Sequence, residues 1–106
     1  MDWRDTFEQE LATGAAARAR GNEGMARVCA RRAAGVVIGE YLRRQARPAP
    51  ATALDRLRLL ASDPAFSPEI HALARRFLAR VTPDYQLPID ADLLADARRL
   101  AEILLA

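Results

Sequence analysis

Residues 22–44, NEGMARVCARRAAGVVIGEYLRR, carry helical character almost without a break and decide the fold. The stretch contains five arginines, the only cysteine of the chain and a Gly-x-x-x-Gly spacing. Apolar residues fall on nearly every side of a helical wheel, which is typical of the central helix of a bundle, or of a helix covered by its own subunit and a second one. Gly35 and Gly39 expose backbone and predict that another helix approaches closely.

Length and composition limit the classes of protein that fit this chain. Its 106 residues allow one domain with one hydrophobic core, which we place over residues 1–106. Apolar residues make up 51% and charged residues 28%, a balance too apolar for disorder and too often interrupted by charge for a membrane span. The opening MDWRDTFEQE lacks the basic start and apolar run of a secretory signal, so we expect a cytoplasmic protein with no membrane partner.

The charge balance argues against a surface dedicated to nucleic acid. Sixteen basic residues, all arginine, oppose fourteen acidic ones and leave a net charge of only +2. Direct nucleic-acid binding is therefore a weakly supported alternative. One cysteine and one histidine, far apart in sequence, give neither a disulfide nor a metal-ligand spacing, so no cofactor or metal is predicted. Cys29 lies on an apolar arc, where we expect inert packing.

Turn residues divide the chain into five predicted helices. Their expected N-caps, in chain order, are Asp2, Asn22, Thr52, Ser67 and Asp90. The third helix is short and ends before Pro64, and no run of alternating β-branched residues predicts a strand. We therefore expect an all-α fold, an up-and-down antiparallel bundle of four main helices plus one short helix.

Helical spacing also predicts which side chains form the core. The apolar stripes are Trp3, Phe7, Leu11 and Gly14 in the first helix, Met25, Val28, Cys29, Ala33, Val36 and Val37 on one arc of the second, Leu54, Leu57, Leu60 and Ala61 in the third, Ile70, Leu73, Ala74, Phe77, Leu78 and Val81 in the fourth, and Leu93, Ala97, Leu100, Ala101 and Leu104 in the fifth.

Most arginines of the second helix have a simple structural interpretation. Glu23 precedes Arg27 and Glu40 precedes Arg44 by four residues, the favourable order for ion pairs on a helix surface. Arg32 instead falls among apolar residues, where it needs a carboxylate or carbonyl partner or an opening to water. We expect a structural ion pair there, with a ligand-contacting arginine as the alternative.

Two segments of the chain resemble a known family. Residues 17–44, ARARGNEGMARVCARRAAGVVIGEYLRR, join a helix that ends in Gly-Asn to a long alanine-rich helix with bulky residues near its end. Residues 80–106, RVTPDYQLPIDADLLADARRLAEILLA, place a Pro-Asp turn before another alanine-rich helix. Together they resemble the HEPN domain family (higher eukaryotes and prokaryotes nucleotide-binding). The resemblance implies a small helical bundle, commonly a homodimer, often encoded beside a minimal nucleotidyltransferase.

Many HEPN branches are metal-independent ribonucleases, which the resemblance ties to an Arg followed after four to six residues by a His. His71 is the only histidine of this chain. Pro64, Ala65 and Phe66 stand where the family's arginine would be needed. The chain thus departs from the ribonuclease motif, and the resemblance implies no catalytic residue.

Two functions are open on this sequence. The first is a non-catalytic homodimeric binding or assembly module. The second is a divergent HEPN-type ribonuclease or nucleotide-binding toxin-antitoxin component. In the second case, one cleft would gather basic or titratable groups from two helices, namely Arg31, Arg32, His71, Arg75 and Arg76. His71, one turn before Arg75, would then grip a phosphate or act as a base; otherwise it is a half-exposed surface histidine.

Overall fold

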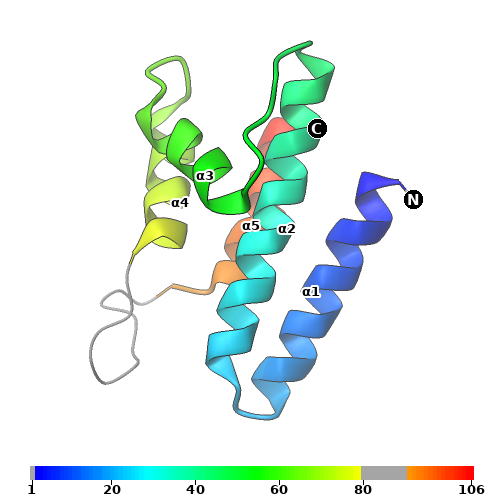
Figure 1. Ribbon diagram of the computed structural model, residues 1–106. Coiled ribbons are helices and arrows are strands. Elements are labelled where there is room, and N and C mark those ends of the chain that lie inside the picture. Colours follow the sequence, from blue (N-terminus) through cyan, green and yellow to red (C-terminus); the bar gives the residue numbers. More distant parts are fainter. Residues whose placement is uncertain (1, 80–90) are drawn as a thin grey trace.

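The computed structural model describes residues 2–79 and 91–106, which form five α-helices and no strand (Figure 1). The helices are α1 (Trp3–Ala19), α2 (Glu23–Arg44), α3 (Ala53–Ser62), α4 (Pro68–Leu78) and α5 (Leu93–Leu104). The prediction of an all-α fold is confirmed. Within these residues, no helix combines the length and apolar character that crossing a bilayer requires.

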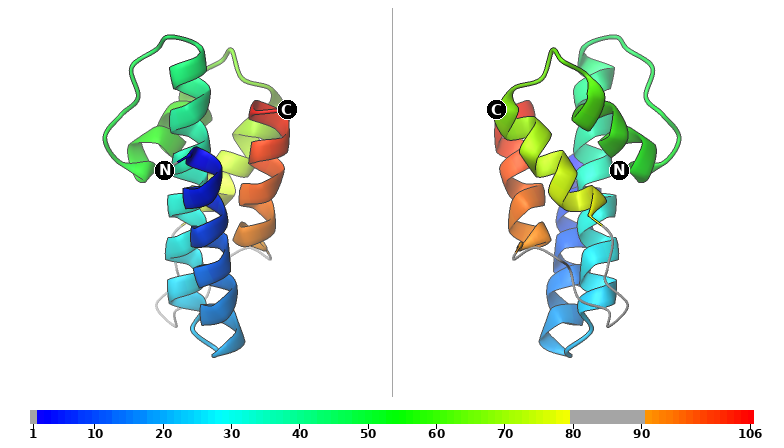
Figure 2. Two further views of the ribbon diagram at one scale, coloured as in Figure 1. Left: turned by 90° about the vertical axis from the view of Figure 1, so that its right-hand side faces the viewer. Right: turned by 90° about the vertical axis from the view of Figure 1, so that its left-hand side faces the viewer.

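The long helix α2 is the centre of the arrangement. It packs antiparallel to α1 across a tight turn, in which Gly21 adopts a φ of 80° that favours glycine. Helix α5 also packs against α2, and α3 contacts both α2 and α4 (Figures 1 and 2). Neighbours within the same chain therefore account for the apolar residues on several sides of α2.

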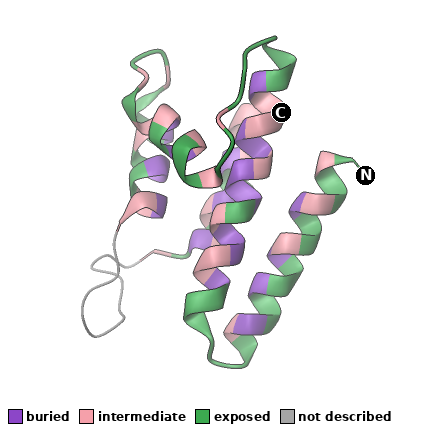
Figure 3. Cartoon of the chain, in the orientation of Figure 1, coloured by how far each residue is buried: buried purple, intermediate pink, exposed green. Residues whose placement is uncertain are grey.

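Burial follows this arrangement (Figure 3). Helix α2 contributes nine buried residues, including Cys29, Ala33, Val37 and Leu42, whereas α1 buries only one side. All five helices supply residues to one core cluster, whose largest fully buried side chain is Phe77. The expected inert packing of Cys29 agrees with its complete burial, which raises the pKa of its thiol.

Helix starts agree with the local sequence chemistry in three cases. The side chains of Asn22, Thr52 and Ser67 each accept a hydrogen bond from a backbone N–H three residues later. Asp2 occupies the N-cap position of α1, but its side chain makes no capping bond. The predicted cap Asp90 lies outside the described residues, and α5 is capped by Asp92, which accepts from the N–H of Ala95.

Both glycines of α2 are closely approached, as predicted, but in different ways. The backbone at the start of α3 approaches Gly35, whereas only a side chain approaches Gly39. A Cβ on Gly35 would lie 2.7 Å from the Cβ of Ala53, at the start of α3. A Cβ on Gly39 would lie 2.5 Å from a terminal nitrogen of Arg56. That guanidinium donates to the carbonyls of Gly35 and Pro50, which ties the loop after α2 back onto the helix.

Several predicted core residues lie nearer the surface than their spacing indicates. Met25 is 40% exposed and Leu54 is 42% exposed. Seven others are only half-buried, namely Trp3, Val28, Val36, Ala61, Leu78, Ala101 and Leu104. Met25 and Leu54 lie in the first turns of their helices, and no element of the described chain covers them. The expected core residue Val81 lies outside the described residues.

Candidate functional site

Most arginine side chains in the described part of the chain contact a carboxylate. Arg76 donates to both oxygens of Asp96 at 2.9 and 2.8 Å, and Glu40 accepts from Arg43 and Arg44. Hydrogen bonds from these two arginines lower the pKa of Glu40 to about 2, with desolvation opposing them. The predicted pairing of Glu40 with Arg44 is thus confirmed.

The predicted pair between Glu23 and Arg27 is wrong. Glu23 accepts instead from Nε of Arg18 at 2.8 Å, across the turn between α1 and α2. Arg18 also binds Asp92 at the start of α5, so the turn and two helix ends share one ionic cluster. Arg27 consequently has no carboxylate partner among the described residues.

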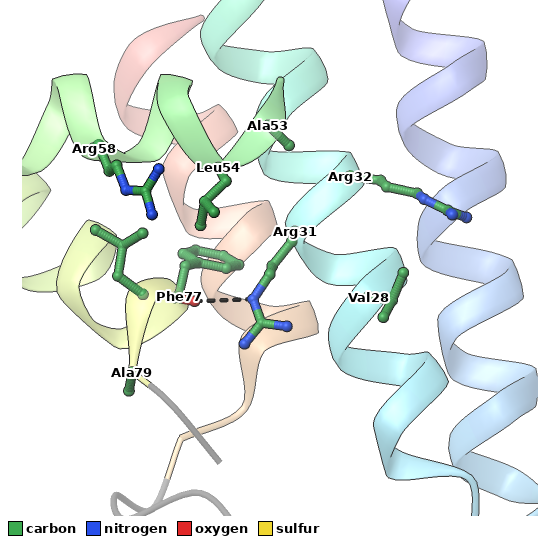
Figure 4. Close-up of a pocket in the computed structure, with 9 residues that line it drawn as sticks. Val28, Arg31, Arg32, Ala53, Leu54, Arg58, Phe77 and Ala79 are labelled. Atoms are coloured by element: carbon green, nitrogen blue, oxygen red, sulfur yellow. Dashed lines mark hydrogen bonds between the residues drawn. The ribbon is translucent and has the colours of Figure 1, made fainter. Parts of the chain in front are cut away.

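Arg31, one turn further along α2, is half-buried and also has no carboxylate partner in the described part of the chain. Its Nε donates to the backbone oxygen of Phe77 at 3.0 Å, near the end of α4 (Figure 4). This bond satisfies one of the last carbonyls of α4, which have no hydrogen-bond partner within the helix. Burial, and then the like charge of Arg27, lower the pKa of Arg31. Its two terminal nitrogens have no hydrogen-bond partner among the described residues.

Arg31 lies in a depression of about 550 Å³ between α2, α3 and α4, which we call the basic depression (Figure 4). Its nine lining residues are Val28, Arg31, Arg32, Ala53, Leu54, Arg58, Phe77, Leu78 and Ala79. These described lining residues include three arginines and no carboxylate. The remainder of the described lining is apolar, so an anion bound here would meet positive charge beside an apolar surface.

The structural ion pair expected for Arg32 is not found among the described residues. Arg32 is exposed, because its neighbours Val28 and Val36 are themselves only half-buried. Its side chain extends toward α1, away from Arg31 (Figure 4). Arg32 therefore lies at the rim of the basic depression. Its side chain is exposed to water, which is one of the possibilities that the sequence left for it.

The other three predicted site residues lie outside the basic depression. His71 lies near the start of α4, where its Nε2 contacts the backbone oxygen of Asp63 at 2.7 Å. Arg31 contacts the backbone oxygen of Phe77, near the other end of that helix. Arg75 is exposed, and Arg76 is occupied by Asp96. The structure brings Arg31 and Arg32 to one depression, and brings neither His71, Arg75 nor Arg76 to it.

No pattern in the sequence predicted the far wall of the depression. Arg58 was not singled out and Leu54 was predicted to be a core residue, yet both line the depression opposite α2. Arg58 also contacts Asp55 at 3.0 Å on the surface of α3. The contact between Arg31 and Phe77 joins residues 46 positions apart, so no local pattern predicts it.

A second depression of about 470 Å³ lies between α1 and α5, and we call it the paired groove. Its lining residues are Leu11, Ala15, Leu94, Ala95, Arg98, Arg99 and Glu102. Arg98 donates to both oxygens of Glu8, and Arg99 contacts Glu69 and Glu102. Both of its arginines are thus already neutralised.

Comparisons with protein-family models, with curated proteins and with solved structures find no match to this chain. Among the described residues, no group of three or more His, Cys, Asp or Glu side chains is placed to hold a metal ion.

Proposed function

We propose that this chain is a non-catalytic binding module that takes an anionic ligand or partner in the basic depression. The observation that carries the proposal is Arg31, which is half-buried with two terminal nitrogens that no described residue engages. A guanidinium in this state offers two parallel donors to a carboxylate or phosphate. The described lining supplies no histidine, carboxylate, cysteine or hydroxyl, so we assign no chemical step to the site.

NMR of the arginine Nε–H groups tests this proposal, because the chain contains its own controls. On titration with citrate, and separately with a nucleoside monophosphate, the Arg31 resonance should shift before those of Arg98 and Arg99. These two arginines already contact carboxylates. A uniform response of all three to both anions would contradict a preferred site at Arg31.

The HEPN resemblance, the up-and-down bundle and the homodimer remain part of the proposal. Support for a second copy comes from Met25, an exposed apolar side chain outside the basic depression. The contacts on several sides of α2, which first suggested a dimer, are made within one chain. Sedimentation equilibrium tests the dimer, and a species of 11.7 kDa at micromolar concentration would contradict it.

The divergent ribonuclease or nucleotide-binding component is a weaker proposal on this geometry. His71 and Arg76 already have partners, and neither lines the basic depression. Cleavage of mixed RNA that disappears in His71→Ala would support the ribonuclease nevertheless. A minimal nucleotidyltransferase as partner is tested by mixing the purified proteins and measuring co-sedimentation.

A further inference from the structure

We propose that the basic depression docks an acidic peptide segment of a partner protein, with one bulky aliphatic side chain of that peptide seated beside Leu54. This inference rests on the proposed binding function and names its partner. The first support is charge complementarity. Arg31 and Arg58 stand on different walls, on α2 and α3. Arg58 contacts Asp55 beside the depression, whereas Arg31 has no carboxylate partner among the described residues. A peptide carboxylate would supply the opposite charge that Arg31 lacks.

The second support is the apolar surface between the two arginines. Leu54 is 42% exposed, one of only two large apolar side chains so exposed in the described chain. In the view of Figure 4, it is drawn between Arg58 and Arg31. Val28 and Leu78, both half-buried, also line this surface. An aliphatic side chain placed here would cover apolar area that now faces water.

The shape of the depression favours a peptide over a small molecule. Sites for small ligands bury most of the ligand, about 70–90% of its surface. Here Leu54, Arg58 and Arg32 are all exposed, so the walls are low. A small anion would remain largely in water, whereas an extended segment can contact both walls and continue beyond them.

The aromatic content of the depression distinguishes a peptide from single-stranded nucleic acid. Proteins that bind single strands offer exposed aromatic rings on which bases stack. Phe77 is the only aromatic lining residue among those described, and it is fully buried. Aliphatic side chains form the accessible part of the surface, and these suit an aliphatic side chain of a peptide.

Fluorescence polarisation with a designed peptide tests the inference. The probe is a short labelled peptide in which glutamates surround a central leucine. We expect a Kd tighter than about 1 mM, weakened about tenfold when alanine replaces the leucine. Raising the salt concentration should weaken binding further. No measurable difference between the leucine and alanine peptides would overturn the inference.

Two variants of the full chain locate the binding. Leu54→Glu places a carboxylate beside Arg31 and Arg58, and should weaken peptide binding by at least about tenfold. Met25→Glu makes the same charge change at a side chain of similar exposure, 40%, outside the lining residues, and should leave the Kd within about twofold. Equal losses in the two variants would overturn the inference. Circular dichroism spectra of both variants serve as the control for folding.

A single-stranded RNA oligonucleotide as a further probe separates the inference from the proposed function. RNA binding that responds to Leu54→Glu, without peptide binding, would overturn the peptide inference and leave the anion-binding function standing. Binding of neither probe, together with a uniform arginine response to citrate and to the nucleoside monophosphate, would overturn both. Peptide binding that responds only to Leu54→Glu supports both.

Discussion

The basic depression and the paired groove are similar in size and in kind of lining, at about 550 and 470 Å³, yet they differ in charge. Both contain arginines beside aliphatic side chains. In the paired groove, Arg98 and Arg99 contact carboxylates from other positions of the chain. In the basic depression Arg58 contacts Asp55, but Arg31 contacts only a backbone oxygen among the described residues. Carboxylate placement, rather than arginine content, therefore decides which surface can attract an anionic partner.

The largest expected effect of a substitution lies beneath the basic depression. Phe77 is fully buried, and Phe77→Ala should lower the free energy of unfolding by about 3–5 kcal/mol through lost burial and a cavity. Urea denaturation measures this loss. Leu54→Ala, on the exposed wall, should stay within about 0.5 kcal/mol of the parent. Similar losses for both variants would mean that the wall and the floor do not differ as the structure describes.

A smaller loss is expected where α3 meets α2. In Gly35→Ala, the new Cβ would lie 2.7 Å from the Cβ of Ala53 and 3.0 Å from its Cα, so α3 must shift. We expect a cost of about 1–3 kcal/mol, measured by thermal or urea unfolding. Because Ala53 lines the basic depression, this shift should also weaken binding of the acidic peptide.

Gly24→Ala is the matched control for this substitution. A Cβ there would meet only Oδ1 of Asn22, at 3.7 Å, which is ordinary contact. The variant should be neutral or gain up to about 1 kcal/mol from the lower backbone entropy of the unfolded chain. If Gly35→Ala is also neutral, the close approach of α3 to α2 does not require glycine at position 35.

One substitution should make the charge of the paired groove more like that of the basic depression. Glu8→Gln leaves Arg98 without the carboxylate that accepts its two hydrogen bonds. The pair is exposed on both sides, so we expect a loss of only about 0.2–1 kcal/mol in unfolding free energy. The Arg98 Nε–H resonance should then respond to citrate more strongly than in the parent. An unchanged response would contradict the role we assign to carboxylate placement.

Sequence reasoning succeeded where the determining contacts are local. Asn22, Thr52 and Ser67 each bond a backbone N–H three residues away, so short motifs suffice to predict them. It failed where two partners compete across a turn. Glu23 has Arg27 four residues ahead but binds Arg18 instead, because the turn brings α1 beside the start of α2.

The candidate site depended on contacts that no short pattern encodes. Arg31 was a candidate ligand residue under the second of the two predicted functions. The structure places it in a depression whose opposite wall comes from α3 and whose floor comes from α4. Helical spacing assigned Leu54 to the core, because periodicity shows which side of a helix is apolar and not whether a neighbour covers it. The exposure of Leu54 follows from how α3 crosses α2.

Acid should affect the two surfaces differently, and this is the smallest change we expect. Hydrogen bonds from Arg98, opposed by desolvation, lower the pKa of Glu8 in the folded chain. The pKa of Glu40, which lines neither surface, is lowered from 4.5 to about 2. A carboxylate with a lowered folded pKa stabilises the fold above its unfolded pKa, and this contribution is lost as the pH falls through the folded pKa. Unfolding free energy should therefore decline between pH 4.5 and about 2, and Glu40→Gln should flatten that decline.

The described lining of the basic depression has no carboxylate to titrate, so the Arg31 bond to Phe77, followed by NMR, should persist until global unfolding. Loss of that bond before the Arg98 pair with Glu8 would contradict the contrast between the two surfaces.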